Sequence, residues 1–277
     1  MLANNNEAII NKLAKNSVKT NKKQYAILFF TIILSAFMLF CVFTIGMTYL
    51  NSSRLQNTRL NGAEYDIATM NGFTSEQLNT LRQNEHVRSV GMESYAGFIK
   101  SSEFDNTVEI GLLWCDETFW NNLMSPARTK LDGHYPQNKN ELMVTKDILK
   151  ACGNENLSVG DSIVLTYENN TGVHTDKFVI SGIWDGYGDK SAGFVSKNFY
   201  DETGYDLKND GILCIKLNRN YVLPTTIQSL EKSLNFSDRQ IFAPTDYIEN
   251  SFKLLLGICG LALVICLSAY LLIYNIL

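Results

Sequence analysis

The sequence predicts a membrane protein in which two α-helical transmembrane segments flank an α+β domain. Residues Tyr25–Leu50 and Leu254–Leu277 contain no charged side chain, and each stretch exceeds the roughly 20 residues that a helix needs to cross a hydrocarbon core of about 30 Å. Between them, strand-like and helix-like patterns alternate in mixed order, which favours an α+β domain. The predicted parts are a cytoplasmic lead-in helix at 1–24, a first span at 25–50, an outer domain with a short stalk at 51–250 and a second span at 251–277.

Charge is distributed unevenly along the chain. The first 24 residues carry five lysines and only one acidic residue, Glu7, whereas the segment between the two spans holds 27 acidic and 18 basic residues. Because that segment is acidic, a basic surface for nucleic acid is excluded on the folded domain. Lysines next to an apolar span predict a cytoplasmic N-terminus by the positive-inside rule. The domain would then lie outside the cell membrane.

Residues 7–23 have the periodicity of an amphipathic helix. At 100° per residue, Ile9, Ile10 and Leu13 fall on one side and the lysines fall on the other. Such a helix can lie flat on an anionic inner leaflet, and the alternative is a basic flank that only sets topology. The candidate interfacial residues are Ile9, Ile10, Leu13, Lys12, Lys15 and Lys19.

The first span is predicted to be a retained anchor. Its apolar run is about twice the usual length of a signal-peptide core, and no small-residue cleavage site follows it. Tyr25 and Tyr49 bracket the span as interface aromatics, and Gly46 is a candidate helix-packing residue near its outer end. The pattern at 50–59 predicts that the helix continues outward as a stalk.

The outer segment then alternates between strands and helices. Thr74 and Gln77 form a capping-box sequence before a helix that ends near Asn84, and Gly153 is a natural stop for a second helix. The clearest hairpin pairs 162–167 with 177–183 across a polar turn. Further strands are predicted at 65–70, 87–99, 107–114, 141–145, 211–217 and 239–243, and further helices around 148–151 and at 225–234.

The second span begins near Phe252. Gly257 and Gly260 lie on nearby faces, so they are candidate packing residues at which another helix could approach closely. No basic residue follows the span, and the sequence ends within the apolar pattern at Leu277. We therefore expect the first part of a longer protein, or a truncated copy.

Motifs for catalysis, cofactors and metals are missing from the sequence. The segment 186–191 lacks the glycine spacing of a phosphate-binding loop, and no Gly-x-Ser-x-Gly elbow is present. His86, His134 and His174 are isolated, whereas a zinc site needs three or four convergent ligands. We expect surface histidines, no cofactor and no enzymatic activity in this chain.

Several other reactive or aromatic residues are expected to be structural. The acidic pairs Asp116–Glu117 and Asp201–Glu202 are predicted to be solvated, since adjacent side chains point in different directions. Core packing is expected, rather than a ligand groove, for Trp114, Phe119, Trp120 and Trp184. The cysteines outside the spans have no disulfide spacing; one pair could form, but small buried side chains are favoured for Cys115, Cys152 and Cys214.

The order of these segments resembles the FtsX/MacB-type permeases of ABC transporters. The resemblance covers nearly the whole chain, although a single matching string such as the Gly-Asp hairpin is common. The matching strings are Leu13–Lys23, Leu131–Pro136 with Asn140–Val144, Ser158–Leu165 with Phe178–Ile183, and Tyr270–Leu277.

The resemblance implies a MacB-like core domain and a permease subunit. Its partner would be a separate cytoplasmic ATPase, and a dimer or a second permease half is implied as well. Such permeases couple ATP hydrolysis to movement of the outer domain, for export or mechanotransmission involving peptides, antibiotics or lipoproteins. Family members carry at least four spans and a cytoplasmic loop that touches the ATPase. That loop is missing here, which leaves Ile9–Lys23 for this contact. The alternative function is a non-transporting membrane sensor or scaffold whose outer domain binds a peptide or a cell-wall enzyme.

Overall fold

The computed structural model of the chain describes residues 7–100, 110–187, 191–218, 224–236, 241–242 and 245–276. The chain divides into two compact units. One consists of Met1–Ser52 with Ser251–Leu277, and the other is Ser53–Asn250.

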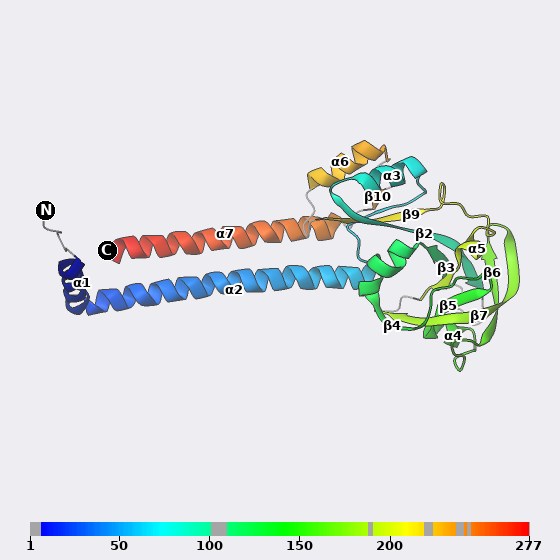
Figure 1. The fold of residues 1–277 in the computed structure, drawn as a ribbon, viewed down its shortest axis with the longest axis horizontal. Helices are drawn as coiled ribbons and strands as arrows, with labels where there is room; N and C mark the ends of the chain where they lie inside the picture. Colours follow the sequence, from blue (N-terminus) through cyan, green and yellow to red (C-terminus); the bar gives the residue numbers. More distant parts are fainter. Residues whose placement is uncertain are drawn as a thin grey trace. The chain divides into compact units, whose positions relative to one another are not determined.

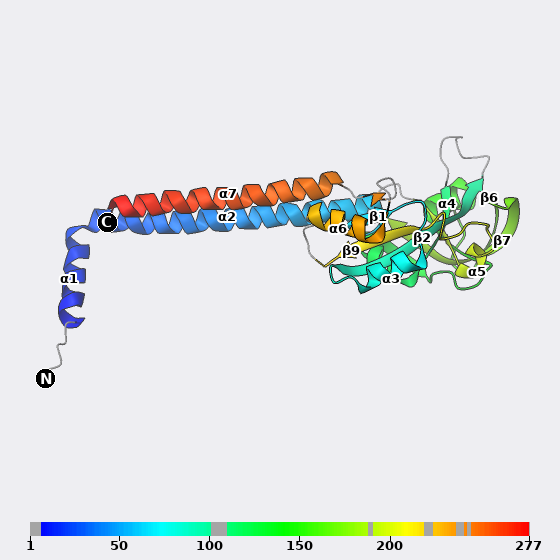
Figure 2. The same ribbon diagram turned by 90° about the horizontal axis from the view of Figure 1, so that it is seen from above.

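The first unit is helical. It holds α1 (Glu7–Thr20), most of α2 (Lys22–Asn61) and most of α7 (Thr245–Ile276). Figure 1 and Figure 2 show α2 and α7 side by side. Both α2 and the Lys253–Asn275 part of α7 are long and apolar enough to cross a membrane. The two predicted spans are therefore helices, and the predicted stalk is the last part of α2.

The lead-in helix is shorter than its sequence pattern predicts. A helix over 7–23 was expected, but α1 ends at Thr20 and α2 begins at Lys22, with α1 turned sharply away from α2 (Figure 2). Thr20 and Asn21 both have low helix propensity. The Thr20 hydroxyl also donates a hydrogen bond to the Asn16 carbonyl at 3.0 Å, a contact that bends helices. The break therefore has a local cause.

The second unit is an α+β domain, as predicted. Its strands are β1 (Ile67–Thr69), β2 (Val87–Lys100), β3 (Ile110–Cys115), β4 (Arg128–Gly133), β5 (Glu141–Thr145), β6 (Ser162–Asn169), β7 (Gly172–Gly186), β8 (Gly193–Val195), β9 (Ile212–Leu217) and β10 (Ile241–Phe242). Its helices are α3 (Ser75–Gln83), α4 (Lys146–Ala151), α5 (Lys197–Tyr200) and α6 (Pro224–Leu234), with a π-helical turn at Phe119–Leu123 and a 3-10 turn at Ser125–Ala127.

Six of these strands close into a ring. The strands follow one another in the order β10-β1-β9-β2-β3-β8-β5-β7-β4, and β6 pairs with both β2 and β7. The sequence of neighbours β2, β3, β8, β5, β7, β6 therefore returns to β2. Apolar side chains from this ring, including Leu112, Leu142 and Ile180, form a buried core. The ring leaves the strands β9, β1 and β10 as an extension beyond β2.

Helices α3 and α6 lie side by side over that extension (Figure 1, Figure 2). Leu81 of α3 and Leu230 of α6 are buried with Ile215 of β9 in a second core. Helix α3 begins with the predicted capping box, in which the Thr74 hydroxyl accepts from the Gln77 N–H and the Gln77 side chain accepts from the Thr74 N–H. Sequence and structure agree closely here because the capping signal is local.

Other predicted elements are present with shifted bounds. The hairpin of β6 and β7 is longer than expected, since β7 runs on to Gly186. Gly153 follows α4 with a φ of 66°, as a helix stop requires. Residues 107–109 of one predicted strand, and 239–240 with 243 of another, lie outside the described residues. The strands β4 and β8 and the helix α5 were not predicted.

Candidate functional site

The described part of the domain contains no metal-binding group of three or more His, Cys, Asp or Glu. His86 and His134 are exposed, as predicted, whereas His174 is only partly exposed. None of Cys115, Cys152 and Cys214 forms a disulfide bond. Burial raises the pKa of Cys115 and Cys214 well above the ordinary value, so both thiols stay protonated and unreactive. The preference for small buried cysteine side chains is confirmed for these two.

The aromatic residues that the sequence singles out belong to the core. All of them are buried, and the guanidinium of Arg128 lies over the ring of Trp120 at 4.0 Å from its centroid. The prediction of core packing is therefore confirmed for Trp114, Phe119, Trp120 and Trp184.

The prediction of a solvated Asp116 is wrong. Its side chain is 13% exposed, and one carboxylate oxygen accepts the N–H groups of Met92 at 2.9 Å and Phe119 at 2.8 Å. Burial raises the pKa of Asp116, and the two hydrogen bonds counter that shift in part. Asp116 therefore caps the turn at 119–123, a local role that its neighbour Glu117, which is exposed, does not share.

The candidate interfacial residues lie on an exposed helix. On α1 the side chains of Ile9, Ile10 and Leu13 are 60%, 60% and 64% exposed. Lys12, Lys15 and Lys19 are exposed as well. A lysine-bearing helix that exposes three large apolar side chains can bind a membrane surface or a partner protein. Either role stays a prediction.

Of the three candidate packing glycines, Gly46 is the one against which another helix lies. A Cβ atom at Gly46 would stand 2.3 Å from Cδ1 of Ile258 on α7, so the absence of a side chain lets the two helices approach. A Cβ at Gly257 or Gly260 would meet nothing within 4 Å in the described chain. These two positions are open to a further helix, and their packing role stays a prediction.

An ion cluster joins the end of α2 to the sheet of the domain. The carboxylate of Glu64, just after α2, forms ion pairs with Arg54 of α2 and Lys216 of β9. The Lys216 side chain is 7% exposed and the Glu64 side chain 24%. Farther along α2, the guanidinium of Arg59 lies 4.0 Å from the ring centroid of Tyr187. Two cations, one from α2 and one from β9, thus converge on the Glu64 carboxylate.

The pKa values agree with a charged cluster. Burial by itself would raise the pKa of Glu64, but the hydrogen bond and charge of Lys216, together with Arg54, bring it below the ordinary value. Burial lowers the pKa of Lys216, and the hydrogen bond to Glu64 counters that change. Glu64 and Lys216 therefore each favour the charged form of the other, in a site where burying either charge without its partner would be unfavourable.

Backbone hydrogen bonds reinforce the same junction. The Glu64 N–H donates to the Leu123 carbonyl at 2.7 Å, and the Asp66 N–H donates to the Ile215 carbonyl at 2.9 Å. The Asp66 carboxylate in turn accepts from the Leu217 N–H at 2.8 Å. The chain leaving α2 is therefore fixed to the turn at 119–123 and to β9 within three residues.

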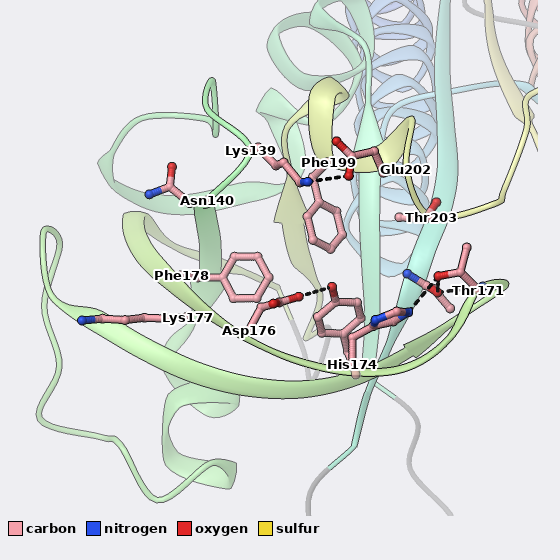
Figure 3. Close-up of a pocket in the computed structure, with 12 residues that line it drawn as sticks. Lys139, Asn140, Thr171, His174, Asp176, Lys177, Phe178, Phe199, Glu202 and Thr203 are labelled. Atoms are coloured by element: carbon pink, nitrogen blue, oxygen red, sulfur yellow. Dashed lines mark hydrogen bonds and ion pairs between the residues drawn. The ribbon is translucent and has the colours of Figure 1, made fainter.

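A pocket of about 400 Å³ opens at the hairpin of β6 and β7. Figure 3 shows it. Its floor is made of three rings with centroids 5.5–6.0 Å apart. They come from β6, β7 and α5 and are Tyr167, Phe178 and Phe199. A volume of this size is within the range of small-ligand sites.

Polar groups surround the aromatic floor. The Tyr167 hydroxyl donates to the Asp176 carboxylate at 2.6 Å, and the His174 ring stacks on Tyr167 with centroids 5.6 Å apart. Across the pocket, Lys139 and Glu202 form an ion pair. Burial, and next the hydrogen bond to Asp176, raise the pKa of Tyr167, so its hydroxyl remains a donor. Sequence reasoning missed this site because its walls come from three distant segments.

Comparisons with known proteins give structural likenesses only. No protein-family model matches the chain, and no curated protein matches it in sequence. The chain is similar to the extracellular domain of the noncanonic ABC-type transporter YknZ from Gram-positive bacteria, with 13% identity and a TM-score of 0.42 over 65% of this chain and 98% of that one. It is also similar to the periplasmic region of MacB from Actinobacillus actinomycetemcomitans, with 12% identity and a TM-score of 0.44 over 70% of this chain and 95% of that one.

Proposed function

We propose that this chain is a permease subunit of an ABC transporter, in which a separate cytoplasmic ATPase moves the outer domain. The observation that carries the proposal is the junction at Glu64. A helix long and apolar enough to cross a membrane ends in a domain to which charged pairs and backbone hydrogen bonds fix it. A helix anchored in this way can pass on a displacement.

The proposed path of force begins at the N-terminus. Closure of the ATPase would displace α1, whose exposed apolar side chains offer it a contact. Helix α2 has no break between Lys22 and Asn61, and a continuous helix keeps its backbone hydrogen bonds along its whole length. A tilt or shift of its first turns would therefore reach Arg54, Glu64 and β9.

ATP hydrolysis is assigned to the partner. The sequence has no phosphate-binding loop that would hold a nucleotide. In this proposal the chain contributes the membrane path and the moving domain. A second permease half, for which Gly257 and Gly260 leave an open helix face, would complete the transporter.

Co-purification of an ABC-type ATPase tests the contact at α1. The full-length chain would be tagged, cross-linked in its native membranes and purified, and the captured proteins identified by mass spectrometry. We expect an ABC-type ATPase with the wild-type chain and its loss with Ile10→Asp or Leu13→Asp. Asn11→Asp adds the same charge at the neighbouring position on the polar face, and it should keep the ATPase. Capture that is equal in all four chains would reject the contact.

A sensor or scaffold is the second candidate function, and the pocket favours it. A domain that binds a ligand at the β6–β7 hairpin needs no transport step. ATP dependence separates the two functions. A permease predicts that ATP changes the protease sensitivity of the outer domain in membranes containing the ATPase, whereas a scaffold predicts the same digestion pattern with and without ATP.

A further inference from the structure

Helix α1 runs across the direction of α2 and is held there by hydrogen bonds (Figure 2). The backbone turns at Asn21, whose N–H donates to the Ser17 carbonyl at 2.9 Å and whose carbonyl accepts from the Tyr25 N–H at 3.1 Å. The hydroxyl groups of Ser17 and Tyr25 form a further hydrogen bond at 3.2 Å. Contacts on both sides of the bend therefore fix α1 against the first turn of α2.

The position of Ser17 shows which side of α1 is turned toward α2. Leu13 precedes Ser17 by four residues and Ile10 precedes it by seven, so the three side chains lie on one face of the helix. Since Ser17 contacts Tyr25 of α2, this face is directed along the course of α2. The apolar side of α1 is therefore turned toward the part of the membrane that α2 crosses.

The bend lies at the level of the lipid headgroups. Tyr25 begins the uncharged stretch of α2, and aromatic rings at the ends of a span lie at the membrane–water interface. Asn21 precedes Tyr25 by four residues, which is about 6 Å along a helix. A helix that leaves α2 at this level and runs across it follows the membrane surface. Its apolar side chains, which are 60–64% exposed in the chain, would there meet acyl chains instead of water.

The charges of this segment fit an anionic surface. Ahead of the first span the sequence holds five lysines and one acidic residue, Glu7. Lys12, Lys15 and Lys19 are exposed on the side of α1 opposite to the apolar one. An anionic membrane attracts lysines through its surface potential, and the long lysine stems let the ammonium groups reach the headgroups. A neutral surface would not supply this attraction.

We propose that α1 binds the surface of an anionic leaflet in membranes without an ATPase, with Ile10 and Leu13 among the upper acyl chains and the lysines at the headgroups. The partner is a lipid with a net negative headgroup. This lipid contact goes beyond the permease function and requires only that α2 crosses the membrane. The proposed ATPase contact uses the same apolar side chains, so lipid and ATPase exclude each other. Lipid is the occupant when the ATPase is absent.

Spin-label accessibility in the full-length chain tests the proposal, in nanodiscs of phosphatidylcholine mixed with phosphatidylglycerol and without an ATPase. Ile10→Cys and Leu13→Cys place a nitroxide on the apolar face of α1, and Asn11→Cys, on the polar face, is the matched control. Oxygen concentrates among acyl chains, whereas a nickel chelate stays in water. We expect the ratio of oxygen to nickel accessibility to be at least about threefold higher at the two apolar positions than at Asn11→Cys. The partly or fully exposed native cysteines are first replaced by alanine, namely Cys41, Cys152, Cys259 and Cys266.

The charge of the lipid is tested separately. In nanodiscs of phosphatidylcholine alone, the difference in accessibility between the two faces of α1 should fall by about half because the surface potential is lost. The triple variant Lys12→Gln, Lys15→Gln and Lys19→Gln should lose a similar share in the anionic nanodiscs, since it removes the charges that respond to that potential. A difference of the same size in both kinds of nanodisc would overturn the recognition of anionic lipid.

Two other outcomes in the anionic nanodiscs would overturn the proposal as a whole. Equal nickel accessibility on both faces would place α1 in water, as a basic flank that only sets topology predicts. Protection of Leu13→Cys from both oxygen and nickel would show that protein covers the apolar face. Because no ATPase or nucleotide is present, failure of this proposal leaves the permease proposal intact, and the co-purification of an ATPase decides that one separately.

Discussion

Glu64 is the residue on which the link between α2 and the domain depends most. Its carboxylate serves two cations, one from α2 and one from β9. Lys216 is nearly buried, so removal of its partner would leave a charge in a poorly solvated place, which costs more than a lost surface ion pair. The partly exposed Arg54 can turn to water instead. The asymmetry predicts that the effect of a substitution at Glu64 comes mainly from Lys216.

Glu64→Gln should therefore destabilise the outer domain by about 2 kcal/mol at pH 7. The folded-state pKa of Glu64 lies below its unfolded value of 4.5, so its contribution is full above pH 4.5 and is lost as the pH falls through the folded pKa. The difference from wild type should shrink below pH 4.5. Urea unfolding followed by tryptophan fluorescence measures it, since Trp114, Trp120 and Trp184 all lie in the domain. Glu155→Gln, at an exposed position, is the control; an equal effect in both variants would remove the special role of Glu64.

At the scale of elements, local signals were predicted well and non-local ones were not. The helix α3 carries its own capping box, and β5 and β9 are short segments composed mostly of apolar residues, so each could be predicted within a residue or two. Strand β8 has only three residues and lies between β3 and β5, so distant partners define it. Strand β4 is exposed over 129–133 and has no apolar alternation to reveal it.

The candidate site divides in the same way. Periodicity identified the exposed apolar residues of α1, because a helix face is a local property. The pocket could not be predicted, since Lys139, Tyr167 and Glu202 meet only after the ring of strands closes. His174 was predicted to be an isolated surface residue, and Glu202 was predicted to be solvated as part of the acidic pair Asp201–Glu202. A sequence cannot show that two such residues border one space.

The packing of α2 against α7 depends on the missing side chain at Gly46. Gly46→Leu should weaken it by about 1–3 kcal/mol, since the added atoms would overlap Ile258. Gly46→Leu with Ile258→Ala should recover at least half of the loss. Gly257→Leu, where a Cβ meets nothing within 4 Å of the described chain, is the matched control. Unfolding in detergent followed by circular dichroism measures the differences, and a harmless Gly46→Leu would contradict this packing.

At the scale of the whole molecule, the chain joins two units of different character. One is a set of helices with exposed apolar surfaces, as lipid requires, and the other is a domain with its own buried cores. Helix α2 belongs to both units. The proposed function assigns each unit a task, with the helices in the membrane and the domain on the outside as the part that moves.

The proposed function requires that the spans place α1 and the domain on opposite sides of the cell membrane. Cysteine labelling with a membrane-impermeant maleimide tests it most directly, in a Cys152→Ala background that removes the half-buried thiol. Lys15→Cys and Glu155→Cys introduce thiols at exposed positions in α1 and in the domain. We expect Glu155→Cys to be labelled in intact cells and Lys15→Cys to be labelled only after permeabilisation. Labelling of both in intact cells, or of Lys15→Cys alone, would contradict it.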